Sequence, residues 1–333
     1  MSPSAILDRI RAGARALKAR IVLPETADPR VLEAAAALAR EGIARPLLLG
    51  SPESVRRAAA GRDLALPPSV EIVDPATDPR LDAFAAELHA VRRAKGMTAE
   101  QARDTIRDPL YFGAMLVRRG DADGCVAGSM SATRDVLRAA IQVIGLAPGI
   151  SVVSSVFLMA LADGRVLTYG DCAVVPDPDA EQLAAIAVAS ARTHERLTGE
   201  RPVVAMLSFS TKGSAEHESV TRVRAATELA RRLDRELEVD GELQFDAAYV
   251  EEVGRRKAPG SPVPGRANVF VFPSLDAGNI AYKITERLGG AQAIGPIIQG
   301  LAKPMHDLSR GCRVDDIVTV SAVCALQAKG GTR

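Results

Sequence analysis

The chain has 333 residues, of which 47% are hydrophobic, and its formal net charge is +1. This length exceeds the usual size of one domain, so we expect two domains, each with a core of its own. A net charge near zero gives no bulk field that would attract nucleic acid or an anionic membrane. No stretch approaches the roughly 20 consecutive apolar residues of a membrane span, and the N-terminus lacks the apolar run of a signal peptide, so a cytoplasmic location is predicted.

The four cysteines indicate reduced thiols. Cys125, Cys172, Cys312 and Cys324 lie far apart in the sequence and form no CxxC pair. This spacing fits neither a disulfide framework nor a structural zinc site, and no bound metal is expected.

The first part of the chain alternates short apolar strands with helices. Strands at 20–25 and 44–50 flank an alanine-rich helix at 31–42. The pattern continues with strands at 70–74 and 124–128 and helices at 81–93 and 133–143. Because the strands are apolar throughout, they fit a parallel sheet covered on both faces by helices.

The sequence GLAPGI at residues 145–150 interrupts this pattern and predicts a domain boundary. Beyond it, the turn signal Asp163-Gly164 predicts a hairpin that begins with a strand at 151–162. The remaining elements are helices at 179–197 and 215–235 and strands at 202–210, 242–246 and 268–274. Residues 252–266 are rich in proline, glycine and basic residues, and predict an exposed loop. The fold class is therefore α/β in both parts.

Two segments combine hydroxyl and basic residues where an anion could bind. In DLSRGCRVDDIV at 307–318, Ser309, Arg310 and the glycine that follows them could form an anion cradle, although a helix N-cap beside a surface arginine explains the same pattern. In GSMSATRDVLRAA at 128–140, a strand ends in small hydroxyl residues and a helix carrying Arg134 follows. That is the geometry of a phosphate site in an open α/β sheet, and a helix cap would account for only one of the hydroxyls.

Two further strand-to-helix junctions, at 208–215 and 273–290, are rich in small and hydroxyl residues. With the basic residues Arg134, Lys283, Arg287 and Arg310, they indicate a ligand that carries several phosphates. There is no GxGxxG fingerprint after a strand and no Walker A motif, so a dinucleotide or a nucleoside triphosphate is not expected. Cys312 could be a nucleophile, but buried filler is the favoured interpretation.

Seven segments together resemble the phosphate acetyltransferase family. They are LPETADPRVLEAAAALAR (23–40), GSMSATRDVLRAA (128–140), YGDCAVVPDPDAEQLAAIAVASA (169–191), LSFSTKGSA (207–215), GELQFDAA (241–248), FPSLDAGNIAYKITERLGG (272–290) and GPIIQGLAKPMHDLSRGCRVDDIV (295–318). The resemblance implies two α/β domains with a cleft between them, an architecture like that of isocitrate and isopropylmalate dehydrogenases. It further implies a discontinuous first domain of residues 1–145 plus 297–333, and a second domain of residues 146–296 that forms the contact in a homodimer.

The resemblance also implies the reaction acetyl-CoA plus phosphate to acetyl phosphate plus CoA, by direct transfer in a ternary complex. Only small-molecule substrates, and neither a permanently bound cofactor nor a metal, are expected. Asp316 is expected to be the base, Ser309 to stabilise the oxyanion and Arg310 to hold the phosphoryl group. The resemblance assigns phosphate or acetyl phosphate binding to Arg134, Arg310, Ser129, Ser131 and Thr133, and CoA binding to Arg30, Arg92, Arg287 and Lys283.

A thiol has a pKa of about 8.5 and a free aspartate one of about 3.9, so Asp316 should be partly desolvated or accept the proton in concert with attack. Where the family usually has asparagine, asparagine and threonine, this chain has His306, Asp276 and Cys324. A modest effect of His306 on the pH profile is expected.

Three alternatives stay open. A butyryl or another acyl preference would leave the same phosphate and CoA contacts. A non-catalytic acetyl-CoA-sensing domain would share the fold. A ping-pong route through acetyl-Cys312 would replace direct transfer.

Overall fold

The computed structural model describes residues 3–329 and divides into two units. The discontinuous unit comprises Leu7–Pro148 and Leu301–Arg333, and the central unit comprises Gly149–Gly300 together with Met1–Ile6. The family resemblance implied breaks after residues 145 and 296.

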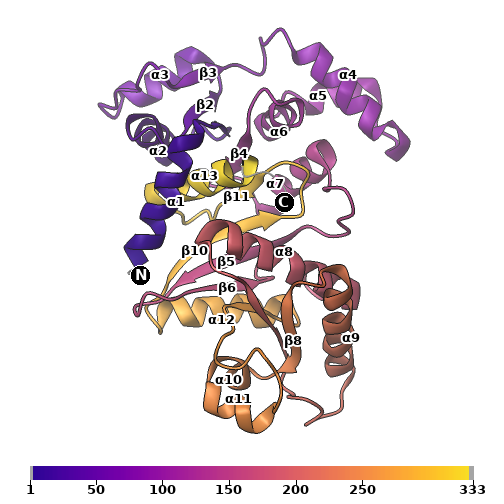
Figure 1. Cartoon of the computed structure of the whole chain (residues 1–333). Helices are drawn as coiled ribbons and strands as arrows, with labels where there is room; N and C mark the ends of the chain where they lie inside the picture. The colour runs from indigo at the N-terminus through magenta and orange to yellow at the C-terminus, as the bar shows by residue number, and fades with distance from the viewer. Residues whose placement is uncertain (1–2, 330–333) are drawn as a thin grey trace. The chain divides into compact units, whose positions relative to one another are not determined.

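The discontinuous unit contains a five-stranded sheet in which every neighbouring pair is parallel. Its strands, in spatial order, are β11 (Met305–Asp307), β4 (Gly124–Ala127), β1 (Arg20–Leu23), β2 (Arg45–Leu49) and β3 (Glu71–Val73). The carboxyl ends of β11, β4 and β1 are therefore neighbours, although their loops lie about 100 or more residues apart in the chain (Figure 1).

Helices connect and cover these strands. They are α1 (Pro3–Leu17), α2 (Pro29–Arg40), α3 (Pro52–Ala60), α4 (Leu81–Arg92), α5 (Ala99–Thr105), α6 (Pro109–Arg119), α7 (Thr133–Ala139) and α13 (Val314–Lys329), with a 3-10 turn at Arg93–Lys95 and a π-helical turn at Ala140–Ile144. Residues such as Val22, Leu47, Phe84 and Phe112 form the core between the sheet and one helical layer. Fully buried strands explain why their sequences carry no polar alternation.

The central unit contains a mixed six-stranded sheet in the order β10-β5-β6-β9-β7-β8. Its strands are β5 (Ser154–Ala160), β6 (Val166–Gly170), β7 (Val203–Leu207), β8 (Glu238–Leu243), β9 (Val269–Val271) and β10 (Gln292–Gln299). β5 and β6 form the predicted antiparallel hairpin, β10 extends it, and the other pairs are parallel. Its helices are α8 (Ala180–Thr198), α9 (Glu218–Leu233), α10 (Phe245–Tyr249), α11 (Glu251–Lys257) and α12 (Leu275–Arg287). The two sheets and their helices confirm the predicted α/β fold class.

Two local predictions in the central unit are wrong. The strand expected at 242–246 lies earlier, at Glu238–Leu243, and helix α10 begins at Phe245. The segment 252–266, predicted as an exposed loop, begins as helix α11. The strand was obscured because it carries the buried acids Asp240 and Glu242, whose partners are basic residues on other segments.

No helix in the part of the chain that the structure describes has the length and apolar character needed to cross a bilayer.

Candidate functional site

Three loops follow neighbouring strands of the discontinuous unit. They are residues 24–28 after β1, 128–132 after β4 and 308–313 after β11, and we call them the strand-end loops. Ligands of open α/β sheets bind just beyond the carboxyl ends of strands, so this edge is where a site is expected. The loops carry two of the segments that the sequence singled out, and a third that it did not.

The carboxylate of Glu25 organises the loop after β4. It accepts hydrogen bonds from the backbone N–H groups of Gly128 (2.7 Å), Ser129 (2.7 Å), Met130 (3.2 Å) and Ser131 (2.7 Å), and from the Ser129 hydroxyl (3.0 Å). Glu25 is only 9% exposed. The backbone N–H groups of this loop, for which the sequence predicted a phosphate site, thus surround a carboxylate of the same chain.

The hydroxyl residues of this loop differ in what they contact. Ser129 is buried and its hydroxyl is used by Glu25. Thr133, at the start of α7, donates from Oγ1 to Oδ2 of Asp307 at 2.6 Å. Ser131 is half-buried, and Arg134 beside it is largely exposed, with only a 3.7 Å ion pair to Asp135. Arg134 is thus the phosphate-binding candidate of this segment that carries a charge, and its guanidinium is exposed.

Asp307 ends β11 and is almost completely buried, with 2% of its surface exposed. Its Oδ1 finds no hydrogen-bond partner among the described residues. Burial raises the pKa of this carboxyl, the hydrogen bond from Thr133 opposes the rise, and the result is a pKa of about 6. Asp307 is therefore a carboxyl that changes charge close to neutral pH.

Ser309 and Arg310 are both exposed, two and three residues beyond this aspartate. A tight turn presents them: the N–H of Cys312 donates to the Ser309 carbonyl at 2.9 Å, and the N–H of Gly311 donates to Ser309 Oγ at 3.2 Å. Both side chains are accessible, as a group that contacts a substrate must be.

Asp316 lies in the first turn of α13. Its Oδ2 accepts from the backbone N–H of Arg313 at 2.8 Å, and the Arg313 guanidinium lies 3.4 Å from Oδ1. The side chain of Asp316 is 37% exposed. Asp316 was expected either to be desolvated or to accept the proton in concert with attack. Within this unit its side chain is not strongly desolvated.

Arg30 connects all three strand-end loops. Its guanidinium donates to both oxygens of Asp28, to the carbonyl of Ser129 at 3.1 Å, and to the carbonyls of Arg310 (2.9 Å) and Cys312 (2.7 Å). Asp28 in turn caps the N-terminus of α2 by accepting from the Arg30 N–H.

The other predicted CoA contacts lie on two helices. Arg92 ends α4 and is half-buried, and its Nε finds no hydrogen-bond partner within the described chain. Lys283 and Arg287 are exposed on α12 of the central unit, where the Lys283 ammonium lies 5.7 Å from the centre of the Tyr282 ring. Their roles toward CoA stay predictions.

Two residues near the β11 loop are poorly suited to chemistry. His306 is fully buried, and burial lowers its pKa to about 4, so it is neutral at physiological pH and its titration does not shape a neutral pH profile. Cys312 is buried and burial raises its pKa, which disfavours the thiolate that a nucleophile needs. Both observations favour structural roles.

Sequence reasoning missed Glu25, Asp28 and Asp307 as parts of this site. Their only signal is position, since Asp307 ends β11 and Glu25 and Asp28 lie in the loop after β1 of the same parallel sheet. An acid at that position faces the backbone N–H groups of neighbouring loops, which are natural anion ligands.

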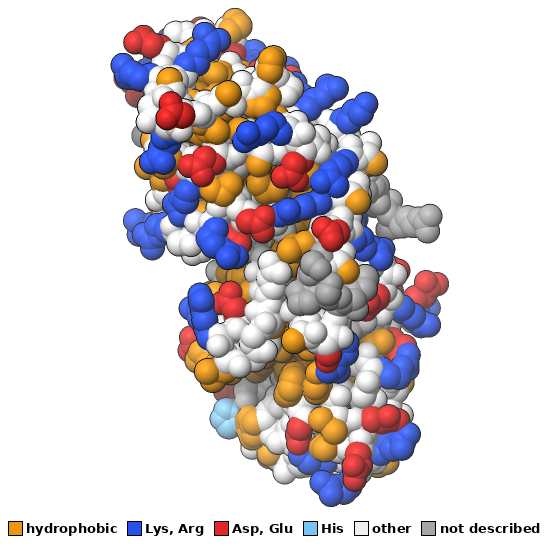
Figure 2. Space-filling view, turned by 90° about the vertical axis from the view of Figure 1, so that its left-hand side faces the viewer, with side chains coloured by type: hydrophobic (Ala, Val, Ile, Leu, Met, Phe, Trp, Pro, Cys, Tyr) orange, Lys and Arg blue, Asp and Glu red, His pale blue; other side chains and the backbone are white. Residues whose placement is uncertain are grey.

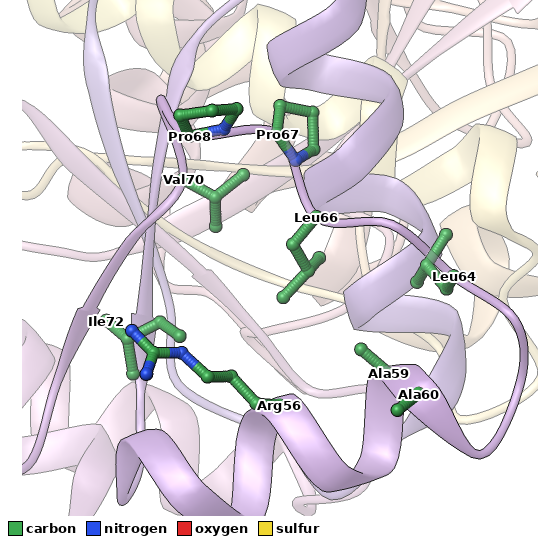
Figure 3. A pocket seen from close by; sticks show the side chains of 9 residues that line it. All are labelled: Arg56, Ala59, Ala60, Leu64, Leu66, Pro67, Pro68, Val70 and Ile72. Carbon is green, nitrogen blue, oxygen red and sulfur yellow. The ribbon is translucent and has the colours of Figure 1, made fainter.

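A separate hollow of about 380 Å³ lies at the edge of the same sheet, beside β3 (Figure 3). It is lined by Arg56, Ala59, Ala60, Leu64, Leu66, Pro67, Pro68, Val70 and Ile72. None of the predicted site residues lines it, and apart from Arg56 its side chains are apolar. No group of histidine, cysteine and acidic residues within the described chain is arranged to hold a metal ion.

One face of the molecule carries charged side chains of both signs (Figure 2). On the face drawn in Figure 2, basic and acidic side chains of the described residues are interspersed. This agrees with the formal net charge of +1.

Comparison with known proteins gives consistent results. The model of the family "Phosphate acetyl/butaryl transferase" matches residues 5–325. A phosphate acetyltransferase of Paracoccus denitrificans is 52% identical over 97% of this chain and 99% of its own length, and one of Thermoanaerobacterium thermosaccharolyticum is 51% identical over the same shares. The crystal structure of a phosphotransacetylase from Streptococcus pyogenes is 44% identical, has a TM-score of 0.95, and matches 99% of this chain and 100% of its own.

These matches extend over both units, and they confirm the resemblance that the sequence motifs indicated. The chain belongs to the phosphate acetyl/butaryl transferase family.

Proposed function

We propose that this protein is a phosphate acetyltransferase, which converts acetyl-CoA and phosphate to acetyl phosphate and CoA, and the reverse. The observation that carries the proposal is the similarity to curated phosphate acetyltransferases, at 52% identity over 97% of the chain. Acetyl-CoA and CoA are substrates in this proposal, no cofactor stays bound, and the enzyme acts in the cytoplasm.

The chemistry is a direct acyl transfer. In the acetyl-CoA-forming direction, the CoA sulfur attacks the carbonyl carbon of acetyl phosphate, and a new S–C bond forms as the thiol proton moves to Asp316. The tetrahedral intermediate then collapses, the C–O bond to phosphate breaks, and phosphate leaves. Ser309 donates to the oxygen that gains charge, and Arg310 and Arg134 offset the charge of the phosphoryl group.

The exposure of Asp316 bears on the timing of the proton. In this unit, 37% of the Asp316 side chain is exposed. We therefore propose that the proton moves in concert with attack, so that no free thiolate accumulates. The contact with Arg313 keeps the carboxylate in one orientation for this step.

The test is an assay of phosphate-dependent thiol release from a panel of acyl-CoAs of rising chain length. Release from acetyl-CoA that requires phosphate is the expected result. The fastest release from butyryl-CoA would instead support the alternative acyl preference. Absence of turnover with every acyl-CoA, in a protein that binds acetyl-CoA, would contradict the enzyme and favour a sensing domain.

Direct transfer is tested separately by isotope exchange. With CoA absent, labelled phosphate should not exchange into acetyl phosphate, because no acetyl-enzyme forms. Appreciable exchange would favour the ping-pong route through Cys312.

We also propose a homodimer whose contact includes α12 of the central unit. Three large apolar residues spaced four apart, Ile280, Ile284 and Leu288, are 57%, 52% and 84% exposed. Ile280 and Ile284 lie on one side of α12 and Leu288 directly follows its last residue, whereas Tyr282 stacks on Phe157 with ring centres 4.1 Å apart. Exposed apolar residues grouped in this way are typical of a protein contact surface. Light scattering should show a dimer that Ile284→Glu converts to a monomer, and a wild-type monomer would contradict the proposal.

A further inference from the structure

The guanidinium of Arg30 has no donor left for a ligand. An arginine side chain carries five N–H donors. Nε donates to Asp28, both N–H groups of Nη1 have carbonyl acceptors in Arg310 and Cys312, and Nη2 donates to Asp28 Oδ2 and to the carbonyl of Ser129. A phosphate could bind this group only by displacing one of these acceptors.

The positive charge of Arg30 is also neutralised by the adjacent carboxylate of Asp28. Asp28 lies 2.7 Å from Nη2, and only 4% of its side chain is exposed against 31% of that of Arg30. The hydrogen bond with Asp28 raises the pKa of Arg30. Burial acts to raise the pKa of Asp28, but the hydrogen bonds from Arg30 outweigh it, and the pKa of Asp28 is lowered. The pair therefore stays fully ionised and has no net charge with which to attract an anion.

The acceptors of Arg30 lie in the loops that carry the proposed catalytic groups. The carbonyl of Ser129 belongs to the loop that leads to Arg134, and the carbonyls of Arg310 and Cys312 belong to the turn that presents Ser309. A rigid, planar fork that bonds to both loops fixes their separation, which is what a site for direct transfer requires.

We propose that Arg30 is a positioning residue that holds the 128–132 and 308–313 loops in register for acyl transfer, and that it is not a ligand of CoA. The proposal rests on the proposed function, since Ser309 and Arg310 are the groups being positioned. It assigns Arg30 a different role from the CoA contact that the family resemblance implied.

The first experiment separates kcat from KM. Arg30→Lys keeps the positive charge, but its three donors on a single nitrogen cannot reach Asp28 and all three carbonyls. The expected result is a kcat lowered at least about tenfold with a KM for CoA within about threefold of wild type, as for loss of a transition-state arrangement. A CoA ligand would give the opposite pattern: near-normal kcat in Arg30→Lys, and in Arg30→Gln a KM for CoA raised about tenfold or more. That pattern would overturn the proposal.

The second experiment uses the partner of Arg30. Asp28→Asn removes the counter-charge and loosens the guanidinium without touching its donors. If Arg30 positions the loops, this change lowers kcat at least about tenfold and leaves the KM for CoA within about threefold. If Arg30 binds CoA, an uncompensated guanidinium should lower the KM for CoA at unchanged kcat. Because the two roles predict different parameters, Asp28→Asn decides the matter even if Arg30→Gln fails to fold.

Two further variants are assayed beside these, one as a matched control and one as a test of Ser309. Arg40→Gln removes another arginine of α2, whose guanidinium, within the described part of the chain, donates only to the Ala36 carbonyl of its own helix, and it should leave both parameters unchanged. Ser309→Ala is assayed in parallel. Normal turnover of Ser309→Ala beside a low kcat in Arg30→Lys would contradict the proposed role of Ser309 and still support positioning by Arg30.

Discussion

Buried and exposed carboxyls on the same unit behave differently because their surroundings differ. Asp307 is buried with one oxygen lacking a hydrogen-bond partner among the described residues, and its pKa is about 6. Asp316, nine residues later, is 37% exposed and contacts Arg313. Ionisation of the buried Asp307 destabilises the fold, whereas the carboxylate of Asp316 is partly exposed. Their roles are therefore separable by experiment.

Replacement of the buried carboxyl should change the pH dependence of stability. The folded pKa of about 6 lies above the reference value of 3.8, so the folded protein holds this proton more tightly and loses stability as pH rises from 4 to 6. Asp307→Asn cannot ionise. Relative to wild type, its free energy of unfolding should rise by up to about 3 kcal/mol between pH 4 and pH 8, since one pKa unit is about 1.4 kcal/mol. Urea denaturation across this range is the measurement, and a pH-independent difference would contradict it.

Replacement of the accessible carboxylate should affect turnover. Asp316→Asn should lower kcat at least about tenfold with little change in either KM, because it removes a proton acceptor needed only in the transition state. Steady-state kinetics in both directions provide the measurement, with Asp315→Asn as the neighbouring control. Near-normal turnover in Asp316→Asn would require a different proton acceptor.

The role of a single residue could be predicted from the sequence where the residues that it contacts lie close to it in the chain. Ser309 and Arg310 stand out within one short motif, and the structure presents both on a tight turn. Glu25 does not stand out, because its five donors come from a loop about 100 residues away. Its role is visible only once β1 and β4 are known to be neighbours.

At the scale of elements, the loop after β4 depends on an anion supplied by the loop after β1. Glu25→Gln leaves one acceptor oxygen and turns an amide NH₂ toward backbone N–H groups. We expect the free energy of unfolding to fall by about 2 to 4 kcal/mol, since buried donors lose charged acceptors. Chemical denaturation measures this, and the control is Glu33→Gln on α2, which replaces a half-exposed carboxylate that has only a 3.7 Å ion pair to Arg62 among the described residues. A loss no larger than that of the control would show that water replaces the carboxylate.

The packing of β4 against α13 provides a second test. A Cβ added at Gly124 would lie 2.3 Å from the Cys324 sulfur and 3.3 Å from the Pro304 carbonyl oxygen. Gly124→Ala should therefore destabilise the protein by about 1 to 3 kcal/mol, as overpacked cores do. In Gly124→Ala with Cys324→Ala, the sulfur is absent, and the double variant should be more stable than the sum of the two single changes. Thermal denaturation of the four proteins measures the coupling, and strict additivity would contradict it.

Elements were predictable where their own residues explain them. The apolar strands β1, β2, β4 and β7 follow the sequence pattern, because both faces of each are buried. Strand β8 does not, since Asp240 and Glu242 point into the fold and are paired with Lys212, Arg231 and Arg224. An alternation of apolar and acidic residues resembles a surface segment until those partners are known.

At the scale of the whole molecule, each sheet contains pairings between strands that lie far apart in the chain, and local sequence cannot show them. β11 has three residues, and it pairs with β4 through Met305 opposite Cys125. No periodicity can be read from so short a strand. The family resemblance implied a returning C-terminal segment, and the residues alone could not have done so.

A buried carboxyl of the central unit, Glu242, should respond to acid in the opposite way to Asp307. In the central unit, Glu242 is 2% exposed; burial acts to raise its pKa, but bonds from Arg224, Gly213 and Ser210 outweigh it and lower the pKa to about 2. This stabilisation, about 3 kcal/mol for a shift from 4.5, is present above pH 4.5 and lost as pH falls toward 2. Glu242→Gln should therefore be destabilised at pH 7 and approach wild type as the pH falls from 4.5 toward 2. A difference that stays constant in denaturation over this pH range would contradict it.

The carboxylate of Glu25 affects whether the 128–132 loop must become ordered again for each turnover. A loop whose N–H groups already surround an anion keeps its shape between turnovers, when phosphate and CoA have left. The conformational entropy of ordering this loop is thus lost once, during folding, and does not weaken the binding of each new substrate. The empty enzyme meets every incoming molecule with this loop in the same form.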